Sequence, residues 1–557
     1  MKHWALVLAL LGFAGAANAQ TDAELRADGT KAGNTDNVLT YGMGYHQNRY
    51  STLDKINKSN VKRLVPVWST SLDNELGEQA QPLVHDGVMY VSNARWTYAM
   101  DALTGRVIWR TAVNFDPDTP RVVCCGNSNK GVAIYNGKVF RGTLDAHVIA
   151  LDMKTGKEVW RQKAAEWKEG YSMTVAPQIA NGVVITGCSG AEFGARCFLD
   201  GWDPETGKKL WRRYTTAGPG EKGHETWEPR EAYLRGGAST WITGSYDPEL
   251  DLVYWGTGNG GPWNDAKRKG DNLYVASVIA IRPKTGEIVW HYQFAPNDVW
   301  DWDTWELIQG DVTVNGQRRK VIMQMSRNGF LYVIDRTNGQ LLSANPFAKV
   351  NWATHVDLKT GRPVESEESK KLRAGGTIQI WPSINGAKNW PHAAFNPNTG
   401  LLYANTYHSY STFKFVPLGE YKAGFRYTGI ENIYPPTPTD EPSGHMEAID
   451  PVSGKPKWRV PLVGYRNASA MLATAGGLLF TGKFSGEFIA LDADTGAQLW
   501  SFKTSSGINA QPITWTKNGK QYVTVLSGLG GVSSARRGLP NTLPAGGSVW
   551  TFALFDQ

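Results

Sequence analysis

The sequence predicts an all-β protein, an eight-bladed β-propeller whose repeats carry tryptophans that dock onto the neighbouring blade. The first observation behind this prediction is a turn motif, Asp-x-x-Thr-Gly or a close variant, which occurs eight times and is often followed by tryptophan. The second is spacing: short apolar runs flank every copy, and the shorter gaps measure about 40–50 residues, the period of four-stranded propeller blades. The third is composition, because 61 Gly, 28 Pro and 23 Trp suit strands and tight turns.

Each copy of the motif is expected to form a hairpin turn between two strands. Its glycine supplies the positive φ that such turns require, and its tryptophan is expected to pack between adjacent sheets. Ring closure is expected from pairing of residues 64–68 with residues 548–554, and the polar residues 20–60 are expected to wrap the outside. The copies begin at Asp101, Asp152, Asp203, Arg282, Asp335, Asn396, Asp450 and Asp492.

The first 19 residues have the pattern of a secretory signal peptide. Lys2 precedes an apolar run at residues 4–16, and Ala17-Asn18-Ala19 forms an A-x-A cleavage site. This run is too short to span a membrane, and no later segment approaches the ~20 apolar residues that a span requires. We therefore expect export to the periplasm, loss of residues 1–19, and a single propeller domain formed by residues 20–557.

The charge pattern and the cysteines narrow the class of protein. The net charge is +7, with basic residues scattered among acidic ones rather than gathered in a run, so a nucleic-acid partner is not expected. The four cysteines, Cys124, Cys125, Cys188 and Cys197, form an even set that allows three disulfide pairings. No C-x-x-C-H motif for covalent haem and no zinc-binding spacing occurs.

One acidic and aromatic stretch stands out as a candidate site. Residues 297–306, Asn-Asp-Val-Trp-Asp-Trp-Asp-Thr-Trp-Glu, hold four carboxylates and three indoles in ten positions. In an extended chain Asp301 and Asp303 point to the same side, and two converging carboxylates repel one another unless a multivalent cation holds them. A charged turn capped by surface tryptophans would give the same pattern. From these residues alone the two interpretations stay open.

Taken together, several motifs resemble those of the periplasmic quinoprotein alcohol dehydrogenases, the methanol and ethanol dehydrogenases that use pyrroloquinoline quinone (PQQ). The resemblance extends from about Asn48 to Phe555 and depends on the ordered set of motifs. They are the repeats, the leader, Cys124-Cys125, residues 189–194 (Ser-Gly-Ala-Glu-Phe-Gly), residues 256–259 (Gly-Thr-Gly-Asn) and residues 300–303 (Trp-Asp-Trp-Asp). The resemblance implies oxidation of primary alcohols and related aldehydes by hydride transfer to PQQ, with a metal ion as Lewis acid and a soluble cytochrome c as electron acceptor.

The same resemblance assigns cofactor contacts. Cys124 and Cys125 match a disulfide between adjacent cysteines that lies against one face of PQQ, and Trp241 matches the indole on the other face. Without the family, Trp241 would be interpreted as one more propeller tryptophan. Arg327 matches the arginine that hydrogen-bonds the quinone oxygens. The other expected contacts are Gln79, Lys130, Thr174, Ser189, Gly190, Ala191, Asn389 and Trp390.

The expected metal site combines four oxygen donors. Glu192 and Asn259 match the family's metal ligands, which suit Ca²⁺ or a lanthanide better than zinc. Asp301 matches the catalytic carboxylate, a metal ligand and the proposed base for the alcohol proton. Asp303 supplies a second aspartate, as in lanthanide members of the family. Calcium members commonly have a small residue, Ser or Thr, at this position. A trivalent ion gains more from this charge, so a rare-earth ion is expected, with Ca²⁺ as the alternative and a turn-capping Asp303 as the competing interpretation.

The sequence departs from the family at two contacts. Lys130 stands where the family has arginine, which keeps the charge but loses the planar two-pronged contact to a carboxylate. Gln79 takes the place of an acidic contact, with Glu78 beside it. Cys188 and Cys197 bracket Glu192, and their spacing permits a disulfide without requiring one.

Three properties are left open by the residues. Segments 406–415 and 426–434 are expected to form aromatic loops over the pocket that would admit alcohols larger than methanol, although they could equally pack against each other. A homodimer is expected only by analogy. The rival functions are a calcium-dependent member of the same family and a non-enzymatic periplasmic propeller scaffold, which would need neither the adjacent cysteines nor the Asp301/Asp303 pair.

Overall fold

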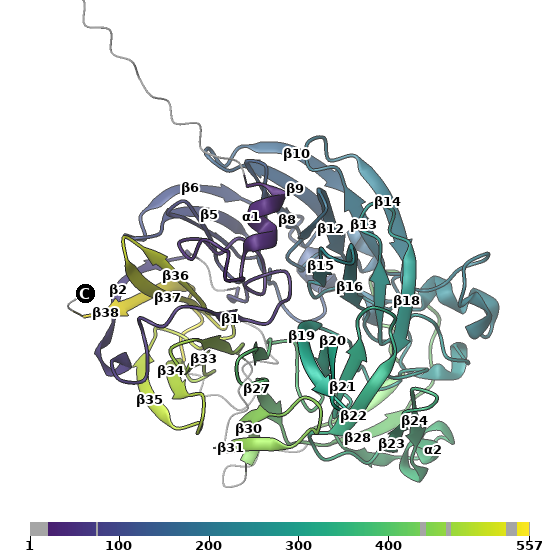
Figure 1. The fold of residues 1–557 in the computed structure, drawn as a ribbon. Helices are drawn as coiled ribbons and strands as arrows, with labels where there is room; N and C mark the ends of the chain where they lie inside the picture. The colour runs from purple at the N-terminus through teal and green to yellow at the C-terminus, as the bar shows by residue number, and fades with distance from the viewer. Residues whose placement is uncertain (1–19, 74–75, 435–441, 464–468, 531–542, 556–557) are drawn as a thin grey trace, which may run out of the picture.

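The computed structural model describes residues 20–73, 76–434, 442–463, 469–530 and 543–555. The predicted signal peptide, residues 1–19, lies outside the described residues. β-Sheets dominate the described part and surround a common centre (Figure 1). It contains seven four-stranded sheets and one five-stranded sheet, together with two small additional sheets. The predicted all-β propeller fold is therefore confirmed.

The sheets follow one another along the chain, mostly as antiparallel hairpins. The first four are β3–β6 (Leu83–His85, Val88–Ser92, Trp96–Asp101, Val107–Ala112), β7–β10 (Ala133–Tyr135, Lys138–Gly142, His147–Asp152, Glu158–Lys163), β11–β14 (Gln178–Ala180, Val183–Gly187, Phe198–Trp202, Lys209–Tyr214) and β15–β18 (Ser245–Asp247, Leu252–Gly256, Ser277–Ile281, Ile288–Gln293). The next two are β19–β22 (Ile308–Val314, Gln317–Met325, Phe330–Asp335, Leu341–Pro346) and β26, β27, β30 and β31 (Ala394–Asn396, Leu401–Tyr407, Pro442–Ile449, Pro456–Val463).

The last two sheets draw on both ends of the chain. They are β1, β32–β35 (Tyr50–Ser51, Leu472–Thr474, Leu478–Gly482, Glu487–Asp492, Gln498–Lys503) and β2, β36–β38 (Leu64–Ser71, Ile513–Lys517, Lys520–Ser527, Ser548–Leu554). β2 pairs antiparallel with β38, with Leu64 opposite Leu554. The predicted pairing that closes the ring is therefore confirmed.

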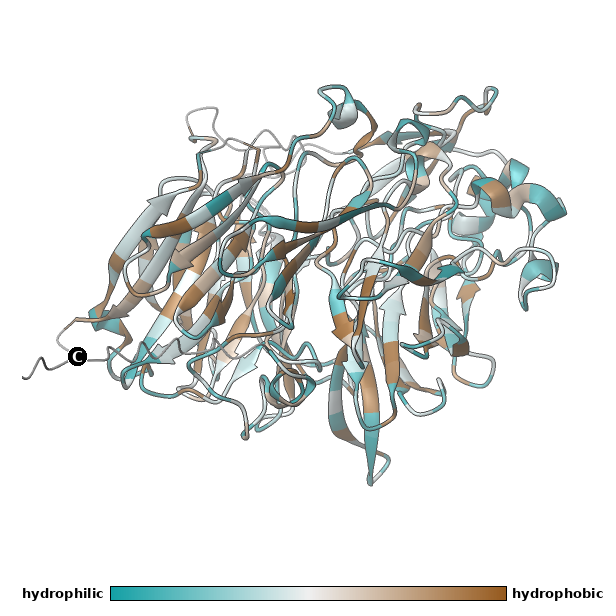
Figure 2. Ribbon diagram, turned by 90° about the horizontal axis from the view of Figure 1, so that it is seen from above, coloured by the Kyte–Doolittle hydropathy of each residue, from teal (hydrophilic) through white to brown (hydrophobic). Residues whose placement is uncertain are grey.

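Smaller elements decorate the ring. Two short helices, α1 (Asp22–Ala27) and α2 (Glu367–Arg373), occur in the described residues, and none of the helices there is long and apolar enough to cross a membrane. The additional sheets are β23–β24 (Ala353–Asp357, Arg362–Glu365) and β25, β28, β29 (Ile378–Ile380, Ser411–Phe415, Ile430–Ile433). Hydrophobic segments lie along the strands, where they form the core between sheets (Figure 2).

The repeated turn has the geometry that its sequence predicts. In the first copy the Asp101 carboxylate accepts from the backbone and hydroxyl of Thr104, at 2.9 and 3.0 Å, and Gly105 has a φ of +70°. A Cβ on Gly105 would lie 2.4 Å from the Trp68 ring, so the residue must be glycine for its neighbour as well as for its own φ. The same carboxylate-to-Thr/Ser bonds recur at Asp152, Asp203 and Asp450.

Tryptophan side chains link successive sheets. The Trp68 indole N–H donates to the backbone oxygen of Ala102 at 3.0 Å, and Trp109 donates to Met153 at 2.9 Å. Each bond therefore joins one sheet to the turn of the next. Trp160, Trp211 and Trp458 make the corresponding bond, whereas the Trp500 indole donates to the backbone oxygen of Leu64, the first residue of β2.

The expectation that residues 20–60 wrap the outside is wrong for the segment 37–51, almost all of which is buried. Its chain crosses one end of the ring (Figure 1), and Gln47 and Arg49 are fully buried. The Arg49 guanidinium donates to the side chains of Gln81 and Gln511, at 2.7 and 2.8 Å. These polar side chains satisfy strand-end carbonyls and amides near the axis, which is why a polar sequence is buried here.

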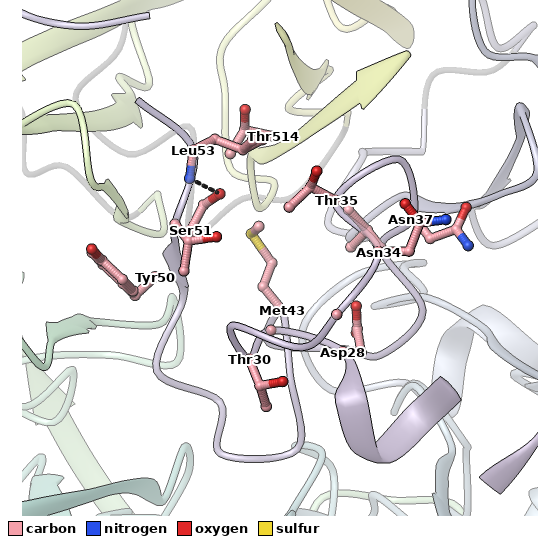
Figure 3. Close-up of a pocket in the computed structure, with 14 residues that line it drawn as sticks. Asp28, Thr30, Asn34, Thr35, Asn37, Met43, Tyr50, Ser51, Leu53 and Thr514 are labelled. Atoms are coloured by element: carbon pink, nitrogen blue, oxygen red, sulfur yellow. Dashed lines mark hydrogen bonds between the residues drawn. The ribbon is translucent and has the colours of Figure 1, made fainter. Parts of the chain in front are cut away.

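A small cavity of about 40 Å³ lies beneath this segment (Figure 3). Asp28 lines it, and its carboxylate accepts from the backbone N–H groups of Leu39 and Thr40, at 3.1 and 2.8 Å, and from the Thr40 hydroxyl at 2.6 Å. Burial raises the pKa of Asp28 to about 6. Leu39 and Thr40 belong to the same N-terminal segment as Asp28, so these bonds give Asp28 a structural role in holding that segment together.

Candidate active site

A cavity of about 330 Å³ is lined by loops that come from all around the ring. This volume is in the range of small-molecule sites. Two predicted site residues, Ala191 and Asn259, are buried behind its wall rather than lining it. The predicted residues that line it are Gln79, Cys124, Cys125, Lys130, Thr174, Ser189, Gly190, Glu192, Trp241, Asp301, Asp303, Arg327, Asn389 and Trp390.

The two central carboxylates converge on one guanidinium, although the extended chain from which this was predicted is not formed: Asp301 has a φ of +63°. Arg327 contacts Asp301 at 3.2 Å and Asp303 at 3.0 Å, and all three side chains are largely buried. Burial raises the pKa of both aspartates above the usual range, while the Arg327 charge lowers it. The remaining Asp301 oxygen, Oδ1, has no hydrogen-bond partner among the described residues. Asp301 lines the cavity, and this buried oxygen has an acceptor to spare.

Asp303 is also tied to the surrounding wall. Its Oδ1 accepts from the backbone N–H of Asn259 at 2.5 Å, and its Oδ2 accepts from the Trp241 indole at 3.2 Å. Neither partner belongs to its own turn, so the competing interpretation of Asp303 as a turn cap is wrong. The residue joins the acidic stretch to the Asn259 loop and to the predicted floor of the cofactor site.

Buried indoles hold the acidic stretch in place. Trp300, Trp302 and Trp305 are at most 2% exposed, so the alternative in which tryptophans cap a surface turn is wrong. The rings of Trp300 and Trp302 stack with centroids 5.4 Å apart. The Asp298 carboxylate accepts from the Trp302 backbone N–H at 3.3 Å. Residues 301–307 form no regular strand, and Asp301 has a φ of +63°.

Three of the oxygen donors predicted for a metal, Glu192, Asp301 and Asp303, line the cavity, and the fourth, Asn259, is hydrogen-bonded to Asp303 behind its wall. Glu192 lies in a short 3₁₀ turn, Ala191–Phe193, and burial and the Asp303 charge raise its pKa. The amide oxygen of Asn259 is buried and has no partner in the described ranges. No group of three His, Cys, Asp or Glu side chains in those ranges could hold a metal by itself. A metal here would need the Asn259 oxygen as well, and unpartnered oxygens beside carboxylates fit a hard multivalent cation.

Aromatic and sulfur groups provide surfaces for a flat ligand. The predicted disulfide between Cys124 and Cys125 is formed and lines the cavity together with Trp241. The Lys130 ammonium lies 4.8 Å from the centroid of the Trp241 ring and 5.2 Å from that of Trp390. Burial lowers the pKa of Lys130 to about 7. A planar anion would find both a stacking surface and a cation here.

Cys188 and Cys197 are buried free thiols in the structure. They bracket the Glu192 turn, as the sequence indicates, but no disulfide joins them.

Several residues at the cavity were not predicted individually from the sequence. The Arg426 guanidinium donates to the backbone oxygen of Cys124 at 2.9 Å, and the Tyr427 backbone N–H donates to the backbone oxygen of Glu192 at 2.7 Å. The expected loop 426–434 therefore reaches the cavity, and Tyr407 brings the 406–415 segment to it. Other unpredicted lining residues are Val123, Gly126, Ser128, Ser172, Ser239, Trp263, Ile384, Asn385, Tyr434, Phe484 and Asn509. Their positions far apart in the sequence carry no local signal.

Comparisons with known proteins show the family to which the chain is similar. The family model described as "Glucose/ethanol/alcohol dehydrogenase, beta-propeller domain", under the label PQQ, matches residues 39–350 and 367–523. The chain is 40% identical over 599 residues to the quinoprotein alcohol dehydrogenase PedH of Pseudomonas putida, covering 99% of this chain and 96% of that protein. It is 42% identical over 539 residues to the quinohemoprotein alcohol dehydrogenase ADH IIB of Pseudomonas putida, covering 91% of this chain and 75% of that protein.

A solved structure is also similar. The structure of a europium-containing methanol dehydrogenase aligns with a TM-score of 0.89 at 36% identity, covering 93% of this chain and 98% of that chain. The residues that line the cavity all fall within the ranges matched by the family model.

Proposed function

The chain belongs to the family of PQQ-dependent quinoprotein alcohol dehydrogenases, and from that membership we propose that it oxidises primary alcohols in the central cavity, with Asp301 as the base. The observation that carries the assignment of Asp301 is its free, buried Oδ1 in a cavity also lined by the Cys124–Cys125 disulfide and Trp241. A non-enzymatic scaffold has no need for this arrangement.

Different residues of the chain are assigned to proton transfer, orientation of the base and cofactor binding. When bound, PQQ would supply the acceptor for the hydride of the alcohol carbon, and a metal ion held by the oxygen donors of Glu192, Asn259, Asp301 and Asp303 would supply a Lewis acid. Asp301 takes the hydroxyl proton on Oδ1, while Arg327 holds its other oxygen at 3.2 Å and keeps the carboxylate oriented. The Cys124–Cys125 disulfide and Trp241 supply stacking surfaces, and Lys130 supplies a positive charge for the carboxylates of the cofactor.

We propose a rare-earth ion at Glu192, Asn259, Asp301 and Asp303, with Ca²⁺ as the alternative. Support comes from Asp303, which lies beside Asp301 and adds one negative charge to the cluster. An added carboxylate stabilises a trivalent ion more than a divalent one because the Coulomb energy scales with the product of the charges. The raised pKa values of Glu192, Asp301 and Asp303 also favour a strong cation, which would keep all three ionised.

The remaining parts of the proposal concern architecture and partners. The eight sheets of four or five strands are assigned as eight blades, and the indole bonds between them as tryptophan docking. Residues 20–557 form one domain after a signal peptide, in the periplasm, and a separate cytochrome c takes the electrons. The aromatic lining from Trp263, Tyr407 and Phe484 suits alcohols larger than methanol.

Reconstitution tests the proposal. Purified apo-protein is mixed with PQQ and either La³⁺ or Ca²⁺, and dye reduction by ethanol is followed. Turnover with La³⁺ and much less with Ca²⁺ is expected. Turnover with Ca²⁺ alone would retain the reaction but reject the rare-earth assignment. No turnover and no bound quinone with either ion would contradict the whole proposal.

The affinity for PQQ is expected to fall as pH rises above about 7. The buried Lys130 has a pKa of about 7 without the cofactor, and facing carboxylates would raise it. Below that pH the ammonium is present before and after binding. Above it, binding must take up a proton, so affinity drops by up to about tenfold per pH unit. Fluorescence titration of PQQ from pH 6 to 9 measures this slope.

The matched control is Lys130→Arg, because arginine stays protonated throughout this range. Its PQQ affinity is expected to lose the Lys130-dependent slope, and calorimetry in two buffers should show less proton uptake than for the wild type. Equal slopes for the two proteins would reject this role of Lys130.

A further inference from the structure

A buried ion pair lies under one wall of the cavity. The side chains of Glu306 and Lys388 are each 1% exposed, and their charged groups are in direct contact. The Lys388 ammonium also donates to the backbone oxygens of Asn389 and Pro391, at 3.0 and 2.9 Å. The Glu306 carboxylate also accepts from the Ala393 backbone N–H at 3.3 Å. The pair therefore fixes residues 388–393 to Glu306.

The two segments that it joins both supply the site. Glu306 closes the acidic stretch that carries Asp301 and Asp303. The segment 388–393 carries Asn389 and Trp390, which line the cavity. The segments are far apart in sequence, so the ion pair is a direct side-chain link between the catalytic stretch and these cofactor contacts.

One indole connects the pair to the catalytic carboxylates. The centroid of the Trp305 ring lies 5.8 Å from the Lys388 ammonium and 5.2 Å from the Arg327 guanidinium. Arg327 in turn contacts both Asp301 and Asp303. A contiguous set of contacts thus runs from Lys388 through Trp305 and Arg327 to the proposed base.

Stability alone is a poor reason for such a pair. Removing two charges from water is unfavourable, and apolar residues of similar volume often stabilise a fold equally well or better. Burial raises the pKa of Glu306 to about 6 and lowers that of Lys388, so each charge depends on the other. The hydrogen bonds to Asn389, Pro391 and Ala393 are directional, so they fix the orientation of this segment, which apolar packing would not specify.

We propose that Glu306 and Lys388 are positioning residues of the active site: they set the 389–390 cofactor contacts relative to the acidic stretch and hold Trp305 beneath Arg327. This inference rests on the proposed function, because the geometry that it controls is that of PQQ and the alcohol base. Neither residue lines the cavity, so neither is assigned a contact with substrate or cofactor.

The test replaces the pair with apolar side chains of similar size, as Glu306→Leu with Lys388→Met in one protein. The matched control is Asp200→Leu with Arg212→Met. Asp200 lies on β13 with a fully buried carboxylate, its partner Arg212 lies on β14, and neither residue lines the cavity. Thermal melting measures the fold, indole fluorescence measures PQQ affinity, and dye reduction measures kcat and KM on the PQQ-loaded proteins.

The double variant at the proposed pair is expected to fold, yet to lose roughly 10- to 100-fold in PQQ affinity or in kcat, as misplacement of supporting residues does elsewhere. The control should stay within about threefold of the wild type at a comparable change in melting temperature. Unchanged affinity and kcat in the double variant would overturn the proposal and leave the pair a purely structural role.

A milder variant covers the case in which the double variant does not fold. Glu306→Gln keeps the shape of the side chain and an acceptor oxygen but removes the charge, and an about threefold or larger loss of PQQ affinity or kcat is expected. Wild-type values for a folded Glu306→Gln would again overturn the proposal. A wild type that neither binds PQQ nor turns over would overturn the proposed function as well, which separates the two failures.

Discussion

Asp301→Asn is expected to bind PQQ and metal yet to lose about 10³-fold in kcat. The amide has the same shape and keeps an oxygen for the Arg327 guanidinium, which contacts the aspartate at 3.2 Å. It cannot accept the alcohol proton, since an amide oxygen is a very weak base. Dye reduction under saturating alcohol measures kcat, and the quinone absorbance of the purified variant measures cofactor content.

The control for this prediction is Asp200→Asn. Asp200 is another buried aspartate beside an arginine, Arg212 at 2.6 Å, but it lies outside the cavity. The same chemical change there should lower stability and leave kcat within about threefold. An Asp301→Asn protein with full activity would reject Asp301 as the base. Loss of PQQ from that variant would instead show that Asp301 acts mainly in binding.

Asp303→Ala is expected to abolish turnover with La³⁺, with an affinity loss for the ion of about 100-fold. The change removes a buried carboxylate that contacts Arg327 at 3.0 Å and accepts from the Asn259 N–H at 2.5 Å. Because a trivalent ion loses more Coulomb energy than a divalent one, the preference between the two ions should move toward Ca²⁺. Titration of each ion into the PQQ-loaded variant, followed by dye reduction, measures both affinities.

Asp303→Asn separates charge from shape. Asparagine keeps an acceptor for the Asn259 N–H and an oxygen donor for the metal, so its PQQ affinity should match the wild type more closely than that of the alanine variant. Its La³⁺ affinity should still fall, because the negative charge is gone. Undiminished La³⁺-dependent rates in both variants would show that Asp303 does not select the ion.

Features encoded in short segments were predictable from the sequence. The Asp101 carboxylate bonds Thr104 three residues later, and Gly105 follows at once, so the whole turn is contained in five residues. The closure of the ring by β2 and β38 followed from the repeats, because the unpaired strands at the two ends of the chain must meet.

Features that depend on distant partners were not predictable. Gln47 and Arg49 read as exposed polar residues, yet the Arg49 guanidinium bonds Gln511 and the carbonyl of Met471, more than four hundred positions away. The residues near Arg49 in the sequence do not indicate those partners. The burial of residues 37–51 across the end of the ring was missed for this reason.

The candidate site shows the same division. Asp301 and Asp303 were expected to face one point in an extended chain; both contact Arg327, but through a backbone with a φ of +63° at Asp301, which the spacing did not predict. The other assigned roles came from the family resemblance, because loops throughout the ring contribute single residues. The Glu306–Lys388 link and the bond from Arg426 to Cys124 were missed, since in each the partners are distant in sequence and meet only in the folded ring.

The most direct test of the central claim is anomalous X-ray diffraction from crystals of the protein loaded with PQQ and La³⁺. One strong anomalous peak is expected in the central cavity, bounded by oxygens of Glu192, Asn259, Asp301 and Asp303, with the quinone between the Cys124–Cys125 disulfide and Trp241. A peak elsewhere, or a quinone bound without a metal beside Asp301 and Asp303, would contradict this claim.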